Sequence, residues 1–292
     1  MRTTSLFLTL AYAASMVMAR PTIRAEPVAE VAETYTSYSS CNRPGVFALT
    51  FDDGPDKYSW GLAKTLHDQG IKATFFINGA NSVNVLEEST TTEEGEKTYL
   101  EVIKQYYDQG HEIASHTYEH KDLKGLTVEE VEYQMNTQSD VIFKAIGKRP
   151  ALMRPPEGVT DDVSAKVLKD LGYHNILWDI DTNDWRHLGL STEQKNVKEV
   201  LDEDIANVTM GHISLEHDIH EDTVNTLVPW LTEYVKSKGL TFVTVSDCIG
   251  VEPYQPDAST GASNTTTTPA TVDAALTADI NLSTIDIDLT NL

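Results

Sequence analysis

Carboxylates and histidines gather in short clusters along the chain, and two of these clusters could together hold a metal ion. The first, TFDDGP, contains Asp52 and Asp53, and the second, SHTYEH, contains His116 and His120. Adjacent carboxylates after a strand point in different directions, so one can bind a metal while the other handles a proton. Histidines at i and i+4 share a face if their segment is helical, and Asp53 would complete a His₂Asp set with positions left for water and substrate. For the aspartates alone, an acidic surface turn is the alternative.

Two further clusters carry groups that could orient a reaction or donate a proton. In RPPEG, Arg154 is held by prolines and can orient a carboxylate bidentately. In DTNDW, Asp181 or Asp184 could orient a histidine and raise its pKa, and Trp185 offers a flat face for a sugar ring. In LEHD, His217 is a candidate general acid. The structural alternatives are a turn with a buried ion pair, a core tryptophan and a satisfied core histidine.

Short apolar runs alternate with helical patterns, and the clusters follow the apolar runs. We expect strands over Val46–Phe51, Ala73–Ile77, His111–Ser115, Leu152–Arg154, Ile176–Ile180, Ile213–Leu215 and Thr241–Val245. We expect helices over Trp60–Gln69, Tyr99–Gln109, Thr127 to about Ile146, Ser164–Leu171, Thr192–Ile205 and Val224–Lys238, and a polar insertion over Asn81–Lys97. This alternation predicts a parallel sheet with helices outside, either barrel-like or doubly wound, with ligands at the carboxyl ends of the strands.

The two ends of the chain differ in composition from its middle. Residues 1–19 combine an early cation, an apolar run and small residues, as in a secretory signal peptide; a buried helix is the alternative. We expect a linker or propeptide over 20–40, a catalytic domain over 41–250 and a disordered Ser/Thr-rich acidic tail over 251–292. Sequons for N-glycosylation begin at Asn207, Asn264 and Asn281.

Charge and cysteine content exclude several classes of protein. With 22 Lys+Arg against 45 Asp+Glu, the net charge of −23 argues against a nucleic-acid partner. No interior stretch approaches the roughly 18 apolar residues of a membrane helix. The only two cysteines, Cys41 and Cys248, flank the middle region, and in an oxidising compartment we expect them to form a disulfide; two free buried thiols are the alternative.

The motifs TFDDGP, HTYEH, RPPEG, DTNDW and LEHD occur in this order, and together they resemble the five motifs of the polysaccharide deacetylases, the NodB-type carbohydrate esterases of family 4. The resemblance covers about Pro44–Asp247 and is strongest to secreted fungal chitin deacetylases. It implies a single-domain α/β fold, a distorted (β/α) barrel with about seven repeats. It also implies a divalent metal, Zn²⁺ first, with Co²⁺ or Mn²⁺ as alternatives.

The resemblance assigns roles to individual residues. Asp53, His116 and His120 would be metal ligands, Asp52 the general base and His217 the general acid. Arg154 would orient Asp52, and Asp184 would tune His217, with Asp181 as the alternative. Leu215 and Trp185 would line the pocket for the acetyl methyl group. At Glu157 the chain departs from the usual aromatic residue, whose backbone N–H helps to bind the oxyanion; a backbone donor survives this change, but the aromatic wall does not.

The expected reaction is metal-dependent hydrolysis of the acetamide of N-acetylglucosamine units in chitin or its oligosaccharides. The alternatives are an O-acetyl esterase acting on xylan or another acetylated glycan, and a non-catalytic chitin-binding relative. We expect a monomer without a membrane span, secreted to the extracellular space or the cell wall.

Overall fold

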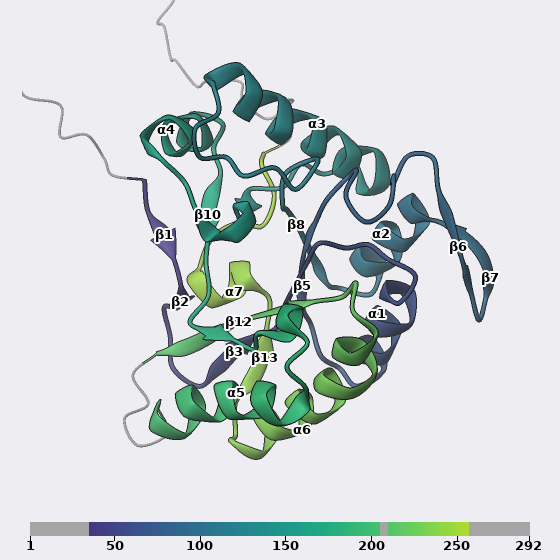
Figure 1. Ribbon diagram of the computed structural model, residues 1–292, viewed down its shortest axis with the longest axis vertical. Helices are drawn as coiled ribbons and strands as arrows, with labels where there is room; N and C mark the ends of the chain where they lie inside the picture. Colours follow the sequence, from purple (N-terminus) through teal and green to yellow (C-terminus); the bar gives the residue numbers. More distant parts are fainter. Residues whose placement is uncertain (1–34, 205–209, 257–292) are drawn as a thin grey trace, which may run out of the picture.

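The computed structural model of the chain describes residues 35–204 and 210–256 (Figure 1). The expected signal peptide, most of the expected linker and tail, and all three sequons lie outside the described residues. Within the part that is described, no helix is long and apolar enough to cross a membrane.

A mostly parallel sheet forms the centre of the molecule. Its strands are β1 (Ser37–Tyr38), β2 (Ser40–Cys41), β3 (Val46–Ala48), β4 (Thr50–Asp52), β5 (Thr74–Ile77), β8 (Glu112–Ser115), β9 (Leu152–Met153), β10 (His174–Ile176), β11 (Ile180–Asp181), β12 (Gly211–His217) and β13 (Thr241–Val243). The order is β1-β10-β9-β8-β5-β4-β12-β3-β13, with β2 and β11 also paired to β12. All of these pairs are parallel except β2 with β12.

The sheet curls back on itself through the segment 174–181. This segment pairs with β9 at its start, through β10, and with β12 at its end, through β11. Between the two strands, the Asp179 N–H donates to the Ile213 carbonyl at 3.1 Å. The result is the expected distorted barrel, in which the carboxyl ends of β4, β8, β9, β11 and β12 face the same side.

Helices surround the sheet, with α3 and α4 on one side and α5 and α6 on the other (Figure 1). Their bounds are α1 (Ser59–Asp68), α2 (Tyr99–Asp108), α3 (Val128–Ile146), α4 (Asp162–Asp170), α5 (Leu190–Asp204), α6 (Val228–Ser237) and α7 (Val245–Ile249), with short helical turns η1 (Pro156–Gly158), η2 (Asp184–Arg186) and η3 (Thr223–Leu227). The expected capping box of α3 is present, since Thr127 accepts from Glu130 N–H and Glu130 caps Thr127 in return. The helix ends at Gly147, whose φ of 69° is the left-handed conformation that favours glycine.

The polar insertion contains a β-hairpin. Strands β6 (Ser89–Thr92) and β7 (Gly95–Thr98) pair antiparallel, and Glu93 and Glu94 form the connection between them. The hairpin extends away from the body of the molecule beside α2 (Figure 1). Thr98 then caps α2 in a second capping box, with Glu101 as its partner.

The core between the sheet and the helices is aromatic and aliphatic. Phe51 on β4 stacks on Phe75 on β5, with ring centroids 5.2 Å apart, and Phe75 stacks on Tyr106 of α2 at 4.1 Å. All three rings are fully buried. They therefore hold the strand that carries the aspartate pair against the outer helices.

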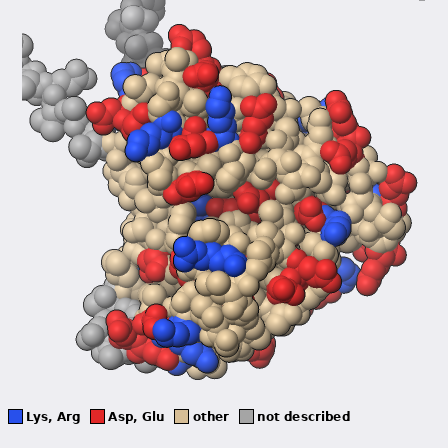
Figure 2. All heavy atoms as spheres, viewed as in Figure 1, with Lys and Arg blue, Asp and Glu red and all other residues tan. Residues whose placement is uncertain are grey.

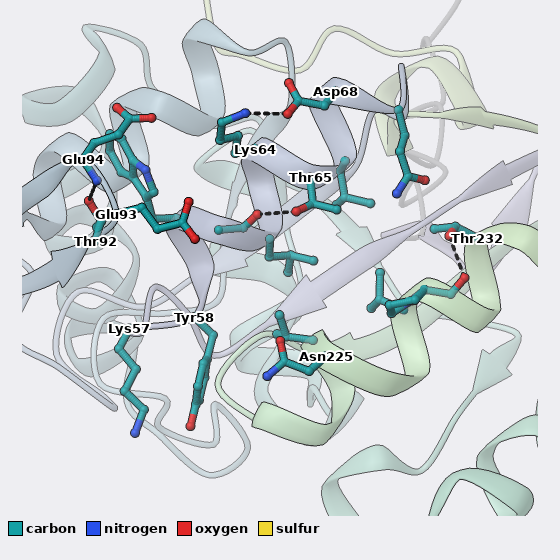
Figure 3. Close-up of a pocket in the computed structure, with 18 of the residues that line it drawn as sticks. Lys57, Tyr58, Lys64, Thr65, Asp68, Thr92, Glu93, Glu94, Asn225 and Thr232 are labelled. Carbon is teal, nitrogen blue, oxygen red and sulfur yellow. Dashed lines mark hydrogen bonds and ion pairs between the residues drawn. The ribbon is translucent and has the colours of Figure 1, made fainter.

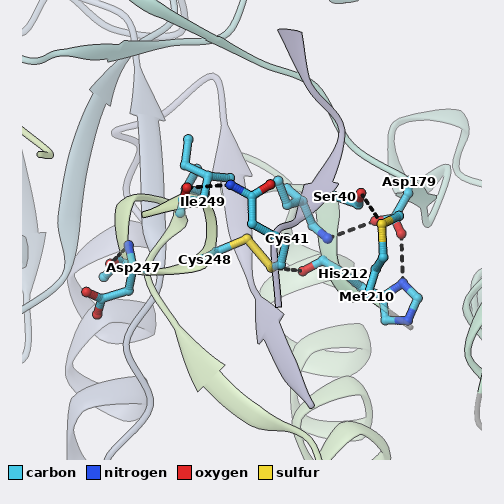
Figure 4. The surroundings of a disulfide bond; sticks show 12 residues. Ser40, Cys41, Asp179, Met210, His212, Asp247, Cys248 and Ile249 are labelled. Atoms are coloured by element: carbon cyan, nitrogen blue, oxygen red, sulfur yellow. Dashed lines mark hydrogen bonds and ion pairs between the residues drawn. A yellow bond between two sulfur atoms is a disulfide. The ribbon is translucent and has the colours of Figure 1, made fainter. Parts of the chain in front are cut away.

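Cys41 and Cys248 form a disulfide, which confirms the predicted pairing (Figure 4). Beside it, the Asn42 side-chain amide donates to the Ile249 carbonyl at 2.6 Å. The fold continues beyond both cysteines, because β1 joins the sheet at one end and Tyr254 pairs with Pro150 at the other.

Two expected strands are interrupted. The run Val46–Phe51 divides at Leu49, because β3 has β13 as its outer neighbour whereas β4 has β5. The run Ile176–Ile180 divides into β10 and β11, because its pairing partner changes from β9 to β12. Both predictions of a continuous strand were therefore wrong.

Candidate metal and catalytic site

Strained backbone positions mark one side of the barrel. Six described non-glycine residues have positive φ, and all of them follow the carboxyl ends of β4, β8, β9 or β11. They are Asp53, Thr117, His120, Glu157, Asn183 and His187. Such conformations cost about 1–3 kcal/mol each and persist only where the surrounding structure imposes them. Their concentration at the strand ends points to a functional site there.

The three predicted ligands meet at this side of the barrel. Asp53 Oδ1, His116 Nε2 and His120 Nε2 all lie within 4.8 Å of one another. The Asp53 oxygen is 3.5 Å from His116 Nε2 and 3.2 Å from His120 Nε2. Metal–ligand bonds of about 2.0–2.1 Å in a tetrahedron place neighbouring ligand atoms about 3.3 Å apart, so the spacing suits a zinc-sized ion. Asp53 Oδ1 is also buried without a hydrogen-bond partner, as a metal ligand would be.

The two histidines lie in a loop and not on a helix. The segment after β8 has no helical assignment, and Thr117 and His120 have φ values of 67° and 52°. The helical spacing considered from the sequence was therefore the wrong reason for their proximity; a folded loop brings the rings together, with centroids 4.9 Å apart.

A backbone carbonyl orients the first histidine. The Nδ1–H of His116 donates to the Arg154 carbonyl at 2.8 Å, which leaves Nε2 facing Asp53. Burial lowers the pKa of His116 and so favours its neutral form. A neutral imidazole held by a second hydrogen bond is the usual state of a metal-ligating histidine.

Asp52 is held by a fully buried arginine. The Arg154 guanidinium donates to Asp52 Oδ1 at 2.7 Å and to Thr50 Oγ1 at 2.8 Å. Its other nitrogens donate to the carbonyls of Ile176 and Leu177 at 3.4 and 3.2 Å. The second carboxylate oxygen, Asp52 Oδ2, lies 3.7 Å from His116 Nε2, on the metal side. Arg154 thus occupies one oxygen of Asp52 and leaves the other directed at the site.

His217 is paired with Asp184. His217 Nδ1–H donates to Asp184 Oδ1 at 2.8 Å, and the backbone N–H of His217 donates to Asp184 Oδ2 at 2.8 Å. Burial opposes protonation of His217, but the hydrogen bond and the charge of Asp184 raise its pKa to about 9. Burial likewise opposes ionisation of Asp184, yet its hydrogen bonds to His217 keep the pKa of this carboxyl lowered. Asp181 instead accepts the Asn183 N–H at 2.7 Å.

Two buried carboxyls beside His217 were missed by sequence reasoning. Glu216 and Asp218 are both completely buried. Burial, and then the charge of Asp184, raise the pKa of Glu216, whose Oε2 accepts from Ser214 Oγ at 2.8 Å. Burial also raises the pKa of Asp218 to about 7. The motif LEHD contains both residues, but nothing in the letters distinguishes a buried carboxyl from an exposed one.

Asp218 connects the loop after β4 to the end of β12. Its Oδ2 accepts from Ser59 Oγ at 2.5 Å and from Tyr106 OH at 3.2 Å. A methyl group added at Gly54 would overlap its carboxyl group. Gly54 follows Asp53 directly, so this contact holds the aspartate turn close to the strand that carries His217.

The residues expected to line the substrate pocket differ in exposure. Leu215 is buried on β12, whereas Trp185 is 47% exposed at the start of η2. Glu157 is exposed in η1, with a φ of 57°. Figure 2 shows a hollow across the middle of the molecule, with acidic atoms on its floor and rim.

The site combines a His₂Asp cluster with two adjoining pairs, Asp52–Arg154 and His217–Asp184, at one side of a barrel of parallel strands. This combination defines the class of a metal-binding hydrolytic site. Residues 39–176 match the family model described as "Polysaccharide deacetylase". The chain is 34% identical to a chitin deacetylase of Colletotrichum lindemuthianum over 219 residues, covering 75% of this chain and 85% of the relative. The chain therefore belongs to the polysaccharide deacetylase family.

Further relatives agree with this assignment. The chain is 36% identical to a chitin deacetylase of Pestalotiopsis sp, covering 74% of this chain and 67% of the relative. It is also 36% identical to one of Arthroderma benhamiae, of which it spans only 54%. The solved structure of the Colletotrichum lindemuthianum chitin deacetylase matches 76% of this chain and 96% of its own, at 33% identity and a TM-score of 0.68. The fold prediction is thereby confirmed.

Proposed function

We propose that this protein is a metal-dependent deacetylase that hydrolyses the acetamide of N-acetylglucosamine units in chitin or chitin oligosaccharides. The products are acetate and the free amine of chitosan. One observation supports this most strongly: a cluster of three ligand atoms within 4.8 Å stands beside an arginine-held carboxylate and an aspartate-paired histidine. Relatives named chitin deacetylases support the substrate class.

Asp53, His116 and His120 would hold the metal, with Zn²⁺ as the first choice and Co²⁺ or Mn²⁺ as alternatives. A divalent cation at this place supplies Lewis acidity and lowers the pKa of a bound water towards about 7. The ligand set suits this role, because two neutral imidazoles and one carboxylate leave a net positive charge and open positions.

Asp52 would act as the general base, accepting a proton on Oδ2 from the attacking water. Arg154 supports this role by binding Oδ1, so that the free oxygen keeps one direction. The arginine is itself buried with no exposed surface, so the carboxylate cannot exchange this partner for solvent.

His217 would act as the general acid and protonate the departing amine, which is too basic to leave as an anion. Its imidazole stays protonated at neutral pH because Asp184 holds Nδ1–H, and Nε2–H is left for the substrate. Asp184, and not Asp181, is therefore the residue that tunes it.

The remaining groups would receive the acetyl group and the sugar. The backbone N–H of Glu157 would donate to the oxyanion, and a donor of this kind is typically worth about 3 kcal/mol. Leu215 and Trp185 would contact the acetyl methyl and the ring. Glu157 replaces the family's usual aromatic side chain with an exposed carboxylate, so this wall of the site is open and negatively charged.

The proposal is tested by acetate release from N-acetylglucosamine oligomers of graded length, with and without a chelator. Asp52→Asn should keep the fold and the bound metal but lose orders of magnitude in turnover. His217→Ala should slow amide hydrolysis far more than hydrolysis of an activated ester, since a good leaving group needs no acid. Near-normal turnover by Asp52→Asn, or equal losses on amide and ester, would contradict the assigned roles. Faster release of acetate from acetylxylan than from chitin oligomers would show that the substrate is an O-acetylated glycan and not chitin.

We also propose that the protein is secreted and monomeric, with a signal peptide over 1–19, a linker up to the first strand and a polar tail after the catalytic domain. The disulfide between Cys41 and Cys248 supports an oxidising compartment. N-glycosylation at Asn207, Asn264 and Asn281 belongs to the same proposal.

A further inference from the structure

A groove outside the catalytic cluster runs along the outer face of α1. It has a volume of about 560 Å³ and lies between the turn of the β6–β7 hairpin and the segment formed by η3 and α6 (Figure 3). This is within the range of about 300–1,000 Å³ that is usual for ligand pockets. Gly61 and Thr65, one helical turn apart on α1, line it, and a Cβ atom added at Gly61 would meet nothing within 4 Å.

The two long sides of the groove differ in chemistry. The side formed by η3 and α6 presents Val224 and Pro229 above the buried Val228, with the amide of Asn225 among them. The α1 and hairpin side presents hydroxyl and charged groups, including Thr65 and Thr92, together with the half-buried Trp60. Apolar surface facing a side rich in hydroxyl and charged groups suits a pyranose chain, whose ring faces are apolar and whose edges carry hydroxyl groups.

The hairpin turn adds two carboxylates to the polar side. Glu93 and Glu94 are exposed, and neither makes an ion pair with any described residue. In Figure 3 they stand at one end of the groove, apart from Asn225. The neighbouring cations are already engaged: Lys64 pairs with Asp68 at 2.5 Å, and the Lys57 ammonium lies over the ring of Tyr58, 4.8 Å from its centroid. The groove can therefore accept positive charge.

One end of the groove adjoins the loops of the catalytic side. Lys57 and Tyr58 line it, and they follow Asp53 by only four and five residues. The Tyr58 hydroxyl donates to Glu221 Oε2 at 3.0 Å, and Glu221 lies four residues after His217. A polymer with one unit at the metal cluster could continue past this contact into the groove.

We propose that the groove binds a glucosamine-containing, deacetylated stretch of the polysaccharide, with ammonium groups facing Glu93 and Glu94 and ring faces on the Val224–Pro229 wall. This inference rests on the proposed function, because deacetylation is what places an ammonium group on each processed unit. The groove would hold the product end of a partly processed chain next to the site that made it.

The test measures binding of a fully deacetylated glucosamine pentamer to the full-length, metal-loaded protein by isothermal titration calorimetry. This pentamer has no acetamide left to hydrolyse, so its binding is measured without turnover. Glu93→Gln/Glu94→Gln should weaken binding about three- to tenfold and reduce its dependence on salt, because two exposed charge pairs are lost. The matched control is Glu129→Gln/Glu132→Gln on α3, which makes the same change in net charge on a different helix; its binding should be unchanged.

A second variant tests whether the pentamer occupies the groove, by filling the space that it would need. Gly61→Gln fills the open space along α1 and replaces a helical glycine with a better helix former, so its melting temperature should be unchanged or higher. Its binding of the pentamer should fall by at least about tenfold, whereas the same variant should deacetylate a short N-acetylglucosamine oligomer at the normal rate.

Three outcomes would overturn the inference. They are unchanged pentamer binding in both groove variants, equal weakening by the α3 control, and equal affinity for a pentalysine peptide. These results are separable from failure of the proposed function, because calorimetry does not depend on turnover. If the protein released no acetate but its pentamer binding still depended on the groove residues, the deacetylase assignment would be rejected. The proposal that the groove binds glucosamine would still hold.

Discussion

The pairing of His217 with Asp184 predicts a large effect of Asp184→Asn on the pH dependence of activity. Burial lowers the pKa of His217, but the hydrogen bond and charge of Asp184, with smaller contributions from Asp52 and Asp53, raise it from the ordinary value of 6.5 to about 9. A difference of about 2.5 pKa units corresponds to about 3 kcal/mol of preference for the protonated imidazole. Without the carboxylate, the pKa of His217 should fall to 6.5 or lower.

This shift can be converted into a rate. At pH 8 a histidine with a pKa of about 9 is roughly nine-tenths protonated, and one with a pKa of 6.5 is about 3% protonated, so the acid form falls roughly thirtyfold. Asp184→Asn should therefore lose at least that factor in kcat/KM for an amide substrate at pH 8, and less at pH 6. The alkaline limb of the pH–rate profile should move to lower pH by more than two units.

The assay combines pH–rate profiles with a titration of the His217 imidazole by proton–nitrogen NMR. Thr223→Val is the matched control, since it removes a 2.8 Å hydrogen bond to Asp184 Oδ2 but keeps the charge. Its alkaline limb should stay close to that of the original protein. If Asp184→Asn lowered activity equally at every pH and left the imidazole titration in place, the electrostatic account of His217 would be refuted.

The same shift has a consequence for stability, with a definite sign. The folded state binds a proton at His217 between pH 6.5 and about 9, where the unfolded state does not. The stabilisation is therefore complete below pH 6.5 and is lost as the pH rises through 9. In Asp184→Asn this decline in the free energy of unfolding should disappear, as urea titrations across that range would show.

Two further predictions concern the framework of the site. Replacing both Cys41 and Cys248 by serine should lower the free energy of unfolding by about 5 kcal/mol, because the disulfide closes a loop with a sequence separation of 207. Urea unfolding would measure this change. A loss below 1 kcal/mol would show that the two ends of the domain are held together without the disulfide. Arg154→Met should lower the free energy of unfolding by about 3–5 kcal/mol, because it leaves the Asp52 carboxylate buried without its cation. An equal loss of stability when Arg154→Met is made in an Asp52→Asn background would contradict that cause.

The order of the motifs and the local signals of helices could be predicted from the sequence. The capping box at Thr127 and the stop at Gly147 depend on residues within a few positions of one another, so the bounds of α3 follow from local chemistry. The pairing of Cys41 with Cys248 was predictable because the chain has no other cysteine. The identity of the three candidate ligands was likewise available, since aspartate and histidine are the groups that bind such metals.

The sequence could not show how these parts meet, because that depends on contacts between distant segments. The interruptions at Leu49 and between β10 and β11 arise where a strand changes its partner, and the imidazole of His116 is oriented by the distant carbonyl of Arg154. Local composition favours a continuous strand or a helix at these positions, and long-range pairing overrides it.

The tertiary structure gives different surroundings to acidic residues that look equivalent in the sequence. Asp181 and Asp184 belong to one short motif, but only Asp184 reaches His217, because η2 turns it towards the end of β12. Glu216 and Asp218 flank the histidine in the sequence as ordinary acidic residues, and the fold encloses both completely. The sequence by itself determined which chemical groups are available, whereas the tertiary structure decided their distances, their partners and their exposure to water, and these set the pKa values on which the proposed chemistry depends.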